Sequence, residues 1–220
     1  MASVNRRRRE KQARIDYQLL RSNGAHWNAT VALVTLRVQP LTPNLWPAIE
    51  DLFEGATACN HCWCMYWRIG RAYTKRPRET NKDAFHRIVQ AGPPPGLLAF
   101  DGDTAVGWCQ LSSRDSLPYL NRSSFLKPID DLPVWCISCF YVRKGYRRLG
   151  LTLALVREAL KIARDAGAPA LEAYPLDMDL TSSSSWTGFA STFLTLGFKC
   201  VTRRRPPRPI MRYTLRQRTR

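Results

Sequence analysis

The sequence has no apolar run long enough to cross a membrane, which takes about 18 or more consecutive residues. The arginine run at Arg6–Arg9 is followed by Glu10 and Lys11, and not by the apolar stretch of a secretory signal. Seven cysteines, an odd number, in a chain without such a signal are typical of reduced thiols. We therefore expect a cytoplasmic protein that is neither secreted nor inserted in a membrane.

Two common nucleotide-binding signatures are missing as well. A nucleoside-triphosphate loop needs Gly-Lys followed by Ser or Thr at the start of a helix, whereas Gly150 is followed by Leu151 and Thr152. A dinucleotide-binding turn needs G-x-G-x-x-G, and this region offers only Gly145 and Gly150. The first class is excluded. The second is disfavoured, although Glu172 stands where that fold would place an acid.

Acidic residues are scarce, with 17 Asp and Glu against 34 Lys and Arg, and the net charge is +17. The excess lies at the ends, because residues 1–22 carry seven basic and two acidic residues, and residues 199–220 carry nine and none. Such ends are either simply solvated or attract nucleic acids such as RNA weakly and nonspecifically. Both interpretations stay open. A membrane surface is disfavoured, since no helix with a large apolar face accompanies the arginines.

The 220 residues, 45% of them hydrophobic, are enough for one buried core. We expect a basic tail over residues 1–26, a single domain over 27–215 and a basic end over 216–220. Hydrophobic periodicity and turn residues predict strands at 31–38, 97–100, 104–111, 199–202 and 210–215, and helices at 42–53, 59–69, 80–91 and 189–196. A polar connection is expected at 112–133 and a flexible loop at 182–185.

The stretch from Val134 to Gly167 organises the chain. Val134–Val142 is almost entirely apolar, β-branched or aromatic, as in a central strand buried on both faces. From Thr152 the apolar residues recur at helical spacing, and Gly167 supplies a stop. A second strand, Ala170–Tyr174, follows within a few residues, so it should run parallel to the first.

The turn between this strand and this helix holds Gly145, Gly150 and four basic residues, among them Arg147 and Arg148. The positive N-terminus of the helix and the backbone N–H groups of the turn should face the same point as the two arginines. Such a turn indicates an anion-binding site, most simply one for phosphate.

Arg147–Thr152 resembles the R/Q-x-x-G-x-G/A signature of the GNAT superfamily of N-acetyltransferases, with Thr152 where Gly or Ala is usual. Phe193–Phe198 (FLTLGF) resembles the terminal helix and Gly-Phe of that superfamily, and the resemblance covers about residues 31–215. The CWCMYWR segment, Cys62–Arg68, and a late PIMR segment resemble a bacterial-type subgroup.

The resemblance implies an α/β (α+β) acyltransferase fold, with a mixed central sheet of about six to seven strands, flanking helices and a splayed parallel strand pair. It also implies acetyl-CoA as co-substrate and direct acetyl transfer to a primary amine. The implied cofactor-binding residues are Phe140, Tyr141 and Val142, through their backbone and with the splay opening after them, and Arg147, Arg148, Leu149, Gly150, Leu151 and Thr152, around the pyrophosphate.

The family's general acid is a tyrosine at the position of Phe193, which has no proton to give. Tyr174 and the hydroxyls of Ser191 and Thr192 are the candidates to replace it, and Glu172 is the candidate to relay the amine proton. Tyr174 can instead be a core aromatic residue and Glu172 a solvent-facing strand residue. A thiolate also leaves without much help, so an acid is not required.

The spacing of Cys59, His61, Cys62 and Cys64 is that of zinc ligands. Cys136 and Cys139 are oddly spaced on a strand, so they should point to opposite faces and cannot both complete one site. We therefore expect no metal. The segment predicts a buried helix that walls the acceptor pocket through Cys62, Trp63, Met65 and Trp67.

These observations favour an N-acetyltransferase acting on a small-molecule amine, because the pocket wall is aromatic while the charge lies at the termini. The alternatives are an aminoacyl-RNA or protein amine as acceptor, or a catalytically silent module that binds acyl-CoA or nucleic acid. The sequence indicates neither the particular amine nor the oligomeric state.

Overall fold

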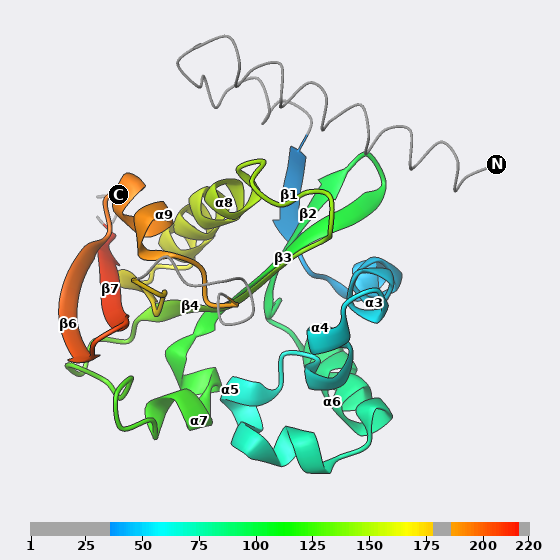
Figure 1. Cartoon of the computed structure of the whole chain (residues 1–220), viewed down its shortest axis with the longest axis horizontal. Helices are drawn as coiled ribbons and strands as arrows, with labels where there is room; N and C mark the ends of the chain where they lie inside the picture. The colour runs from blue at the N-terminus through cyan, green and yellow to red at the C-terminus, as the bar shows by residue number, and fades with distance from the viewer. Residues whose placement is uncertain (1–35, 178–185, 216–220) are drawn as a thin grey trace, which may run out of the picture.

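A computed structural model of the chain describes residues 36–177 and 186–215, which form one sheet flanked by helices (Figure 1). The strands are β1 (Leu36–Pro40), β2 (Gly96–Asp101), β3 (Thr104–Ser113), β4 (Trp135–Val142), β5 (Ala170–Ala173), β6 (Lys199–Arg205) and β7 (Arg208–Thr214). The helices are α3 (Trp46–Glu54), α4 (Thr57–Cys62), α5 (Tyr66–Ile69), α6 (Arg78–Ala91), α7 (Pro118–Asn121), α8 (Leu151–Asp165) and α9 (Ala190–Thr195), with 3-10 helices at Pro43–Leu45, Gly70–Lys75 and Arg114–Ser116. In the described ranges no helix is long and apolar enough to span a membrane.

The strand order is β1-β2-β3-β4-β5-β7-β6. Strands β4 and β5 are parallel, and the other neighbouring strands are antiparallel. The parallel pair is joined by α8, which starts after Gly150 (φ 79°) and is followed by Gly167 (φ 75°), both in the left-handed region that glycine adopts readily. The predicted mixed sheet with one parallel pair is confirmed.

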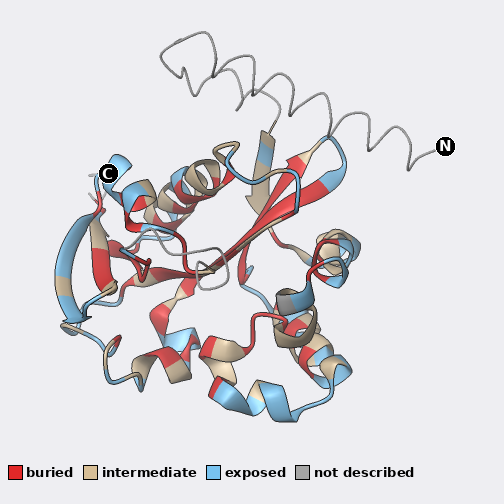
Figure 2. Cartoon of the chain, viewed as in Figure 1, coloured by how far each residue is buried: buried red, intermediate tan, exposed pale blue. Residues whose placement is uncertain are grey.

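Apolar side chains are buried on both faces of the sheet, and Figure 2 shows buried residues along the central strands. Helices α8 and α9 supply Leu155 and Phe193 to the core on one face. On the other face, Phe53 and Phe85 lie edge-on to Trp108 of β3, each with 5.9 Å between ring centroids. Burying each of these side chains stabilises the fold by about 1.5 to 3 kcal/mol.

The helix predicted at 59–69 is interrupted. Trp63 and Cys64 have φ values of 45° and 53°, so α4 ends and α5 begins separately. The helix predicted at 42–53 likewise begins as a 3-10 turn before α3, and the connection predicted at 112–133 contains α7. The loop predicted at 182–185, the two basic ends and residues 31–35 of the first strand lie outside the described residues.

A β-bulge in β4 changes which side chains share a face. Gln110 of β3 pairs with Cys139 and Leu111 pairs with Ile137, so Ser138 is the extra residue. Cys136 therefore lies on the same face as Cys139, among the residues packed under α3 to α7, while Ile137 packs in the core under α8. The prediction that Cys136 and Cys139 point to opposite faces is wrong, because it assumed an unbroken alternation.

Candidate functional site

Strand β4 extends beyond the end of its parallel neighbour. Strand β5 pairs only with Trp135–Ile137 and ends at Ala173, whereas β4 continues to Val142. The two strands therefore part before Phe140, and the expectation that they part after Val142 is corrected. The bulge at Ser138 lies at this point and increases the local bend of β4.

The peptide groups along this part of β4 alternate in direction. The Arg143 N–H donates to the Val106 carbonyl at 2.9 Å, so the peptide group of Tyr141 also faces β3. Those of Phe140 and Val142 face the opposite side, where β5 has ended. The Phe140 N–H donates to the carbonyl of Trp186 at 2.6 Å. The Phe140 carbonyl and the Val142 peptide group therefore border the gap between the strands.

The turn after β4 is anchored at one end and exposed at its tip. Arg143 is buried, donating through Nε to the Ala105 carbonyl at 3.0 Å and through Nη2 to Asp51 at 2.5 Å. Arg147 and Arg148 are exposed, and Arg148 has a φ of 64°. Neither forms an ion pair with a carboxylate among the described residues, so both charges are available to an anion.

Helix α8 begins at this turn with no acidic residue in its first turn and no side-chain cap. The first amides of a helix have no partner within the helix, and its N-terminus carries a partial positive charge. Gly150 and the N–H groups of Leu151 and Thr152 therefore face the same region as the exposed arginines. The turn combines a helix N-terminus with two cations, which suits a phosphate or pyrophosphate.

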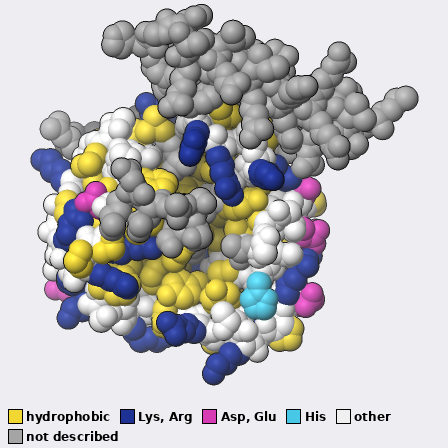
Figure 3. All heavy atoms as spheres, viewed as in Figure 1, with side chains coloured by type: hydrophobic (Ala, Val, Ile, Leu, Met, Phe, Trp, Pro, Cys, Tyr) yellow, Lys and Arg dark blue, Asp and Glu magenta, His cyan; other side chains and the backbone are white. Residues whose placement is uncertain are grey.

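Aromatic side chains gather under α5 and α7 on the face of the sheet opposite α8. Trp67 donates through Nε1 to the Ser138 carbonyl at 3.1 Å, and its ring lies 4.6 Å from that of Tyr66 and 5.7 Å from that of Trp186. Tyr119 lies 5.4 Å from Tyr66. Figure 3 shows hydrophobic side chains around a hollow on this side of the molecule, with basic side chains at its rim.

The four residues predicted to wall an acceptor pocket do not lie together. Trp67 lies over the bulge of β4, whereas Trp63 is fully buried between Trp46 and Phe53, at centroid distances of 5.6 and 5.4 Å. Met65 is buried in the same helical core, and Cys62 is half-buried. The sequence interpretation missed Tyr119 and Trp186, because neither lies in the aromatic segment Cys62–Arg68.

A sequence profile described as the acetyltransferase (GNAT) family matches residues 57–179, which is more than half of the chain and includes β4, the turn and α8. The chain belongs to the GNAT acetyltransferase family. It is accordingly an acetyltransferase with acetyl-CoA as the acetyl donor. No curated protein matches the sequence.

Solved structures resemble this acetyltransferase at low sequence identity. A proposed acetyltransferase of Acinetobacter baylyi ADP1 has a TM-score of 0.50 and 15% identity, covering 82% of this chain and 93% of its own. The PaiA N-acetyltransferase of Thermoplasma acidophilum, solved with coenzyme A, has a TM-score of 0.49 and 19% identity, covering 82% and 99%. The ribosomal-protein-S18-alanine N-acetyltransferase of Escherichia coli has a TM-score of 0.47 and 13% identity, covering 84% and 96%. None of these likenesses identifies the acceptor of this enzyme.

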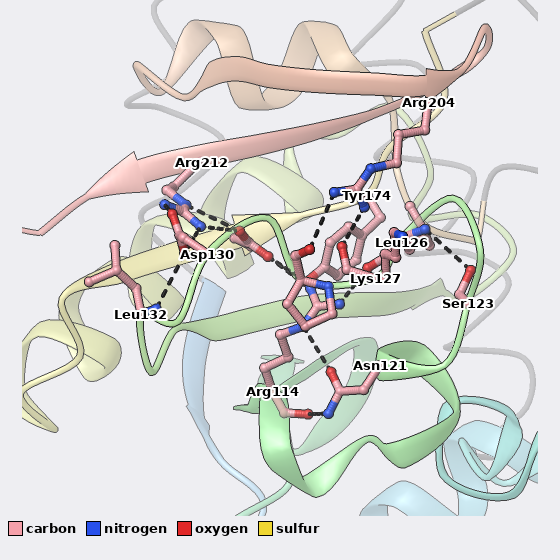
Figure 4. Close-up of polar contacts among 12 residues, drawn as sticks. Arg114, Asn121, Ser123, Leu126, Lys127, Asp130, Leu132, Tyr174, Arg204 and Arg212 are labelled. Atoms are coloured by element: carbon pink, nitrogen blue, oxygen red, sulfur yellow. Dashed lines mark hydrogen bonds and ion pairs between the residues drawn. The ribbon is translucent and has the colours of Figure 1, made fainter.

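Glu172 of the acetyltransferase is a buried member of an ion-pair network (Figure 4). Its side chain is 2% exposed, and Arg114 and Arg212 donate to its two oxygens at 2.9 and 2.7 Å. Arg212 also holds Asp130 through two bonds of 2.6 and 2.9 Å, and these bonds lower the pKa of Asp130. Both oxygens of Glu172 are occupied by cations, so it is not a solvent-facing strand residue.

Tyr174 belongs to the same network. Its hydroxyl accepts from Arg114 at 2.6 Å and donates to Glu172 at 2.9 Å. Figure 4 labels Tyr174 together with Arg114 and Arg212. Burial raises the pKa of Tyr174 well above its usual value, and the neighbouring Cys136 and Glu172 raise it further. The hydroxyl therefore holds its proton firmly.

In this acetyltransferase an apolar residue, Phe193, stands at the position where the family pattern has a tyrosine as general acid. Phe193 is fully buried, with ring centroids 6.2 Å from Phe140 and 5.1 Å from Phe198. Ser191 is exposed and Thr192 is half-buried on the same short helix. The structure therefore offers no proton donor at the residue that the family pattern designates.

The cysteines form no metal site in the described part of the chain, where no group of three His, Cys, Asp or Glu side chains could hold an ion. Burial raises the pKa of Cys62 to about 12 and also raises that of Cys59, with Cys64 adding to both. Such thiols stay protonated at neutral pH in the metal-free protein. The absence of a structural metal remains a prediction.

Proposed function

We propose that the acetyltransferase binds acetyl-CoA along the open edge of β4 and transfers the acetyl group directly to the primary amine of a small molecule. The observation that carries this proposal is the extension of β4 beyond β5, which leaves the peptide group of Val142 and the carbonyl of Phe140 facing a gap. An extended, amide-containing pantetheine arm can add to such an edge as a strand would. The reactive thioester would then lie where β4 and β5 part.

The turn before α8 would hold the pyrophosphate of the donor. Arg147 and Arg148 supply charge, while Gly150, Leu151 and Thr152 supply the backbone amides of a helix N-terminus. Tyr141, whose peptide group faces β3, would not contribute its backbone. Leu149, half-buried in the turn, packs against the core below α8 and would stabilise the conformation of the turn.

In the proposed reaction the uncharged amine nitrogen attacks the thioester carbonyl carbon, the carbon–sulfur bond breaks, CoA leaves as thiolate, and the proton lost by the nitrogen passes to solvent water. The protein contributes alignment and backbone hydrogen bonds to the oxyanion. A thiol has a pKa of about 8.5, so the thiolate leaves at neutral pH without a general acid. This chemistry is compatible with Phe193 in place of tyrosine. Nothing in the structure tests the proton-transfer roles predicted for Glu172 and Tyr174. Because both side chains are held in a buried ion-pair network, we propose a structural role for them instead.

We further propose that the acceptor is a small molecule and that the reaction takes place in the cytoplasm. The support for a small acceptor is the aromatic cluster of Tyr66, Trp67, Tyr119 and Trp186 beside the bulge of β4, since enclosed aromatic walls suit a compact ligand. The support for the compartment is that all seven cysteines are free.

Deleting residues 1–22 separates a small acceptor from one borne on RNA. We expect the truncated enzyme to acetylate a small amine with unchanged kcat and KM and unchanged dependence on salt, because the site lies in the folded domain. Full-length protein should bind RNA weakly, with an affinity that falls steeply with salt concentration. The measurement is a salt titration of acetylation and of RNA binding for both proteins.

A third protein ending at Leu215 provides the control for the other end, because it removes Arg216–Arg220 and leaves β7 intact. Tight RNA binding that persists at physiological salt, together with no turnover of any free amine, would contradict the proposal of a small acceptor.

A further inference from the structure

Three hydrogen-bond donors lie buried and without partners on the face of the sheet that α5 covers. They are Nε of Arg68, Nε2 of Gln110 and Oγ of Ser112. Gln110 is only 1% exposed, and its Oε1 already accepts from the Ser138 hydroxyl at 3.0 Å, so only its amide nitrogen is unused. A buried donor without an acceptor is costly, so a group of them indicates an acceptor that arrives with a ligand.

The contacts of these residues bring them to one region. Ser112 lies directly opposite Cys136, and Gln110 lies opposite Cys139, so both side chains face α5. Trp67, the residue before Arg68, is fixed over the bulge by its bond to the Ser138 carbonyl at 3.1 Å. Arg68 donates through Nη1 to the Ser116 carbonyl at 3.0 Å, and Cys136, opposite Ser112, is among the groups that act on its charge.

Arg68 has no carboxylate partner in the described part of the chain. Burial lowers the pKa of Arg68, and the neighbouring groups that oppose this are the thiols of Cys64 and Cys136. Its Nη1 is bonded to Ser116, whereas Nε, on one edge of the guanidinium, is unbonded. This edge matches the two oxygens of a carboxylate, which it can bind bidentately.

We propose that Arg68, Gln110 and Ser112 bind a carboxylate of the acceptor, so that the substrate is an amino acid or a similar amine with a carboxylate. The inference rests on the proposed function and deepens it. The bulge that supplies Ser138 is also where β4 and β5 part, so a carboxylate under α5 would lie beside the gap that takes the thioester. The aromatic rings of Tyr66 and Trp67 would adjoin the side chain of such a substrate.

The test compares matched acceptors by the release of CoA thiol. The panel contains phenylalanine with phenethylamine, tyrosine with tyramine, and an aminoalkyl phosphate. The expected result is that kcat/KM for the amino acids exceeds that for the decarboxylated amines by about 10-fold to 100-fold, the effect of a charge-assisted contact. Arg68→Met should remove this preference, mainly by raising KM for the amino acids, and should leave kcat/KM for the decarboxylated amines and the binding of acetyl-CoA unchanged.

Arg71→Met is the matched control, because Arg71 is an exposed residue three positions on and carries the same charge. Gln110→Glu is a second variant, whose new carboxylate would pair with Arg68 internally and favour the decarboxylated amines over the amino acids. If Arg68→Met lowers kcat/KM equally for all acceptors, the three donors form a structural cluster that bonds to water. That result would overturn the proposal. A preference for the phosphate over the carboxylate would overturn it too. Absence of acetyl-CoA binding in the unchanged enzyme would instead refute the proposed function.

Discussion

Acetyl-CoA at about 100 times its dissociation constant should raise the free energy of unfolding of this acetyltransferase by about 2.7 kcal/mol, and Gly150→Asp should abolish the increase. Gly150 is the N-cap of α8, so the new carboxylate would stand where the pyrophosphate is proposed to bind. Two negative groups at one helix N-terminus repel each other, while a single carboxylate interacts favourably with the partial positive charge there and offsets part of the strain of an aspartate at positive φ. The variant should therefore stay folded and lose the ligand. Thermal unfolding with and without acetyl-CoA measures both effects.

Gly102→Asp provides the matched control. Gly102 also has a positive φ, of 57°, and a Cβ added there would meet open space in the hairpin between β2 and β3. Both variants therefore place an aspartate at a positive φ and add the same charge, but only one lies at α8. Arg147→Ala should weaken the stabilisation more mildly, because it removes one contact and leaves the amides in place. Unchanged stabilisation in Gly150→Asp would refute the assignment of the turn.

Glu172→Gln should destabilise the protein by about 3 to 5 kcal/mol, the usual cost of removing one partner from a buried ion pair. The substitution keeps the shape of the side chain but leaves Arg114 buried without a negative charge. Arg114 also donates to Asn121 at 2.8 Å and to the Leu126 carbonyl, so the loss should loosen the segment between β3 and β4. Denaturant unfolding measures the free energy, and kcat is measured where both proteins remain folded.

Glu54→Gln is the control on the surface. Glu54 is 48% exposed and pairs with Arg78 at 3.2 Å and Lys82 at 3.5 Å, so its loss should cost no more than about 1 kcal/mol. We expect kcat of folded Glu172→Gln to stay close to that of the unchanged enzyme. A large fall in kcat with little change in stability would instead identify Glu172 as the group that takes the amine proton.

The central unit could be predicted from the sequence because its signals are local. Val134–Val142 has the composition of a buried strand, and the helix that follows has a clear apolar stripe. Gly150 and Gly167, both at positive φ, mark the two ends of this helix. Each of these signals lies within a few residues of the element that it defines. The strand, the turn and the helix follow from them without knowledge of the rest of the chain.

The bulge at Ser138 could not be predicted, because one unpaired residue in a strand leaves no mark in composition or periodicity. It reverses the face of every following side chain, which is why Cys136 and Cys139 share a face. The left-handed Trp63 and Cys64 were equally hidden, since bulky residues rarely adopt positive φ. Both features are imposed by tertiary packing.

The partners of Glu172 were hidden for a different reason. Arg114 and Arg212 lie 58 and 40 residues away along the chain, and no pattern in the sequence links them to β5. A lone acid on a strand therefore looked available for catalysis. Gln110 and Ser112 likewise lie 42 and 44 residues from Arg68 in the sequence, so the proposed carboxylate site also became visible only in the structure.

The measurement that tests the account most directly is the initial rate of CoA thiol release from acetyl-CoA, with and without free amines, combined with mass spectrometry of the amine product. We predict thiol release that depends on the amine, yields one acetylated amine for each thiol and disappears in Gly150→Asp. Acetyl-CoA binding without thiol release for any amine in the panel would contradict the account and identify the protein as a silent acyl-CoA-binding module.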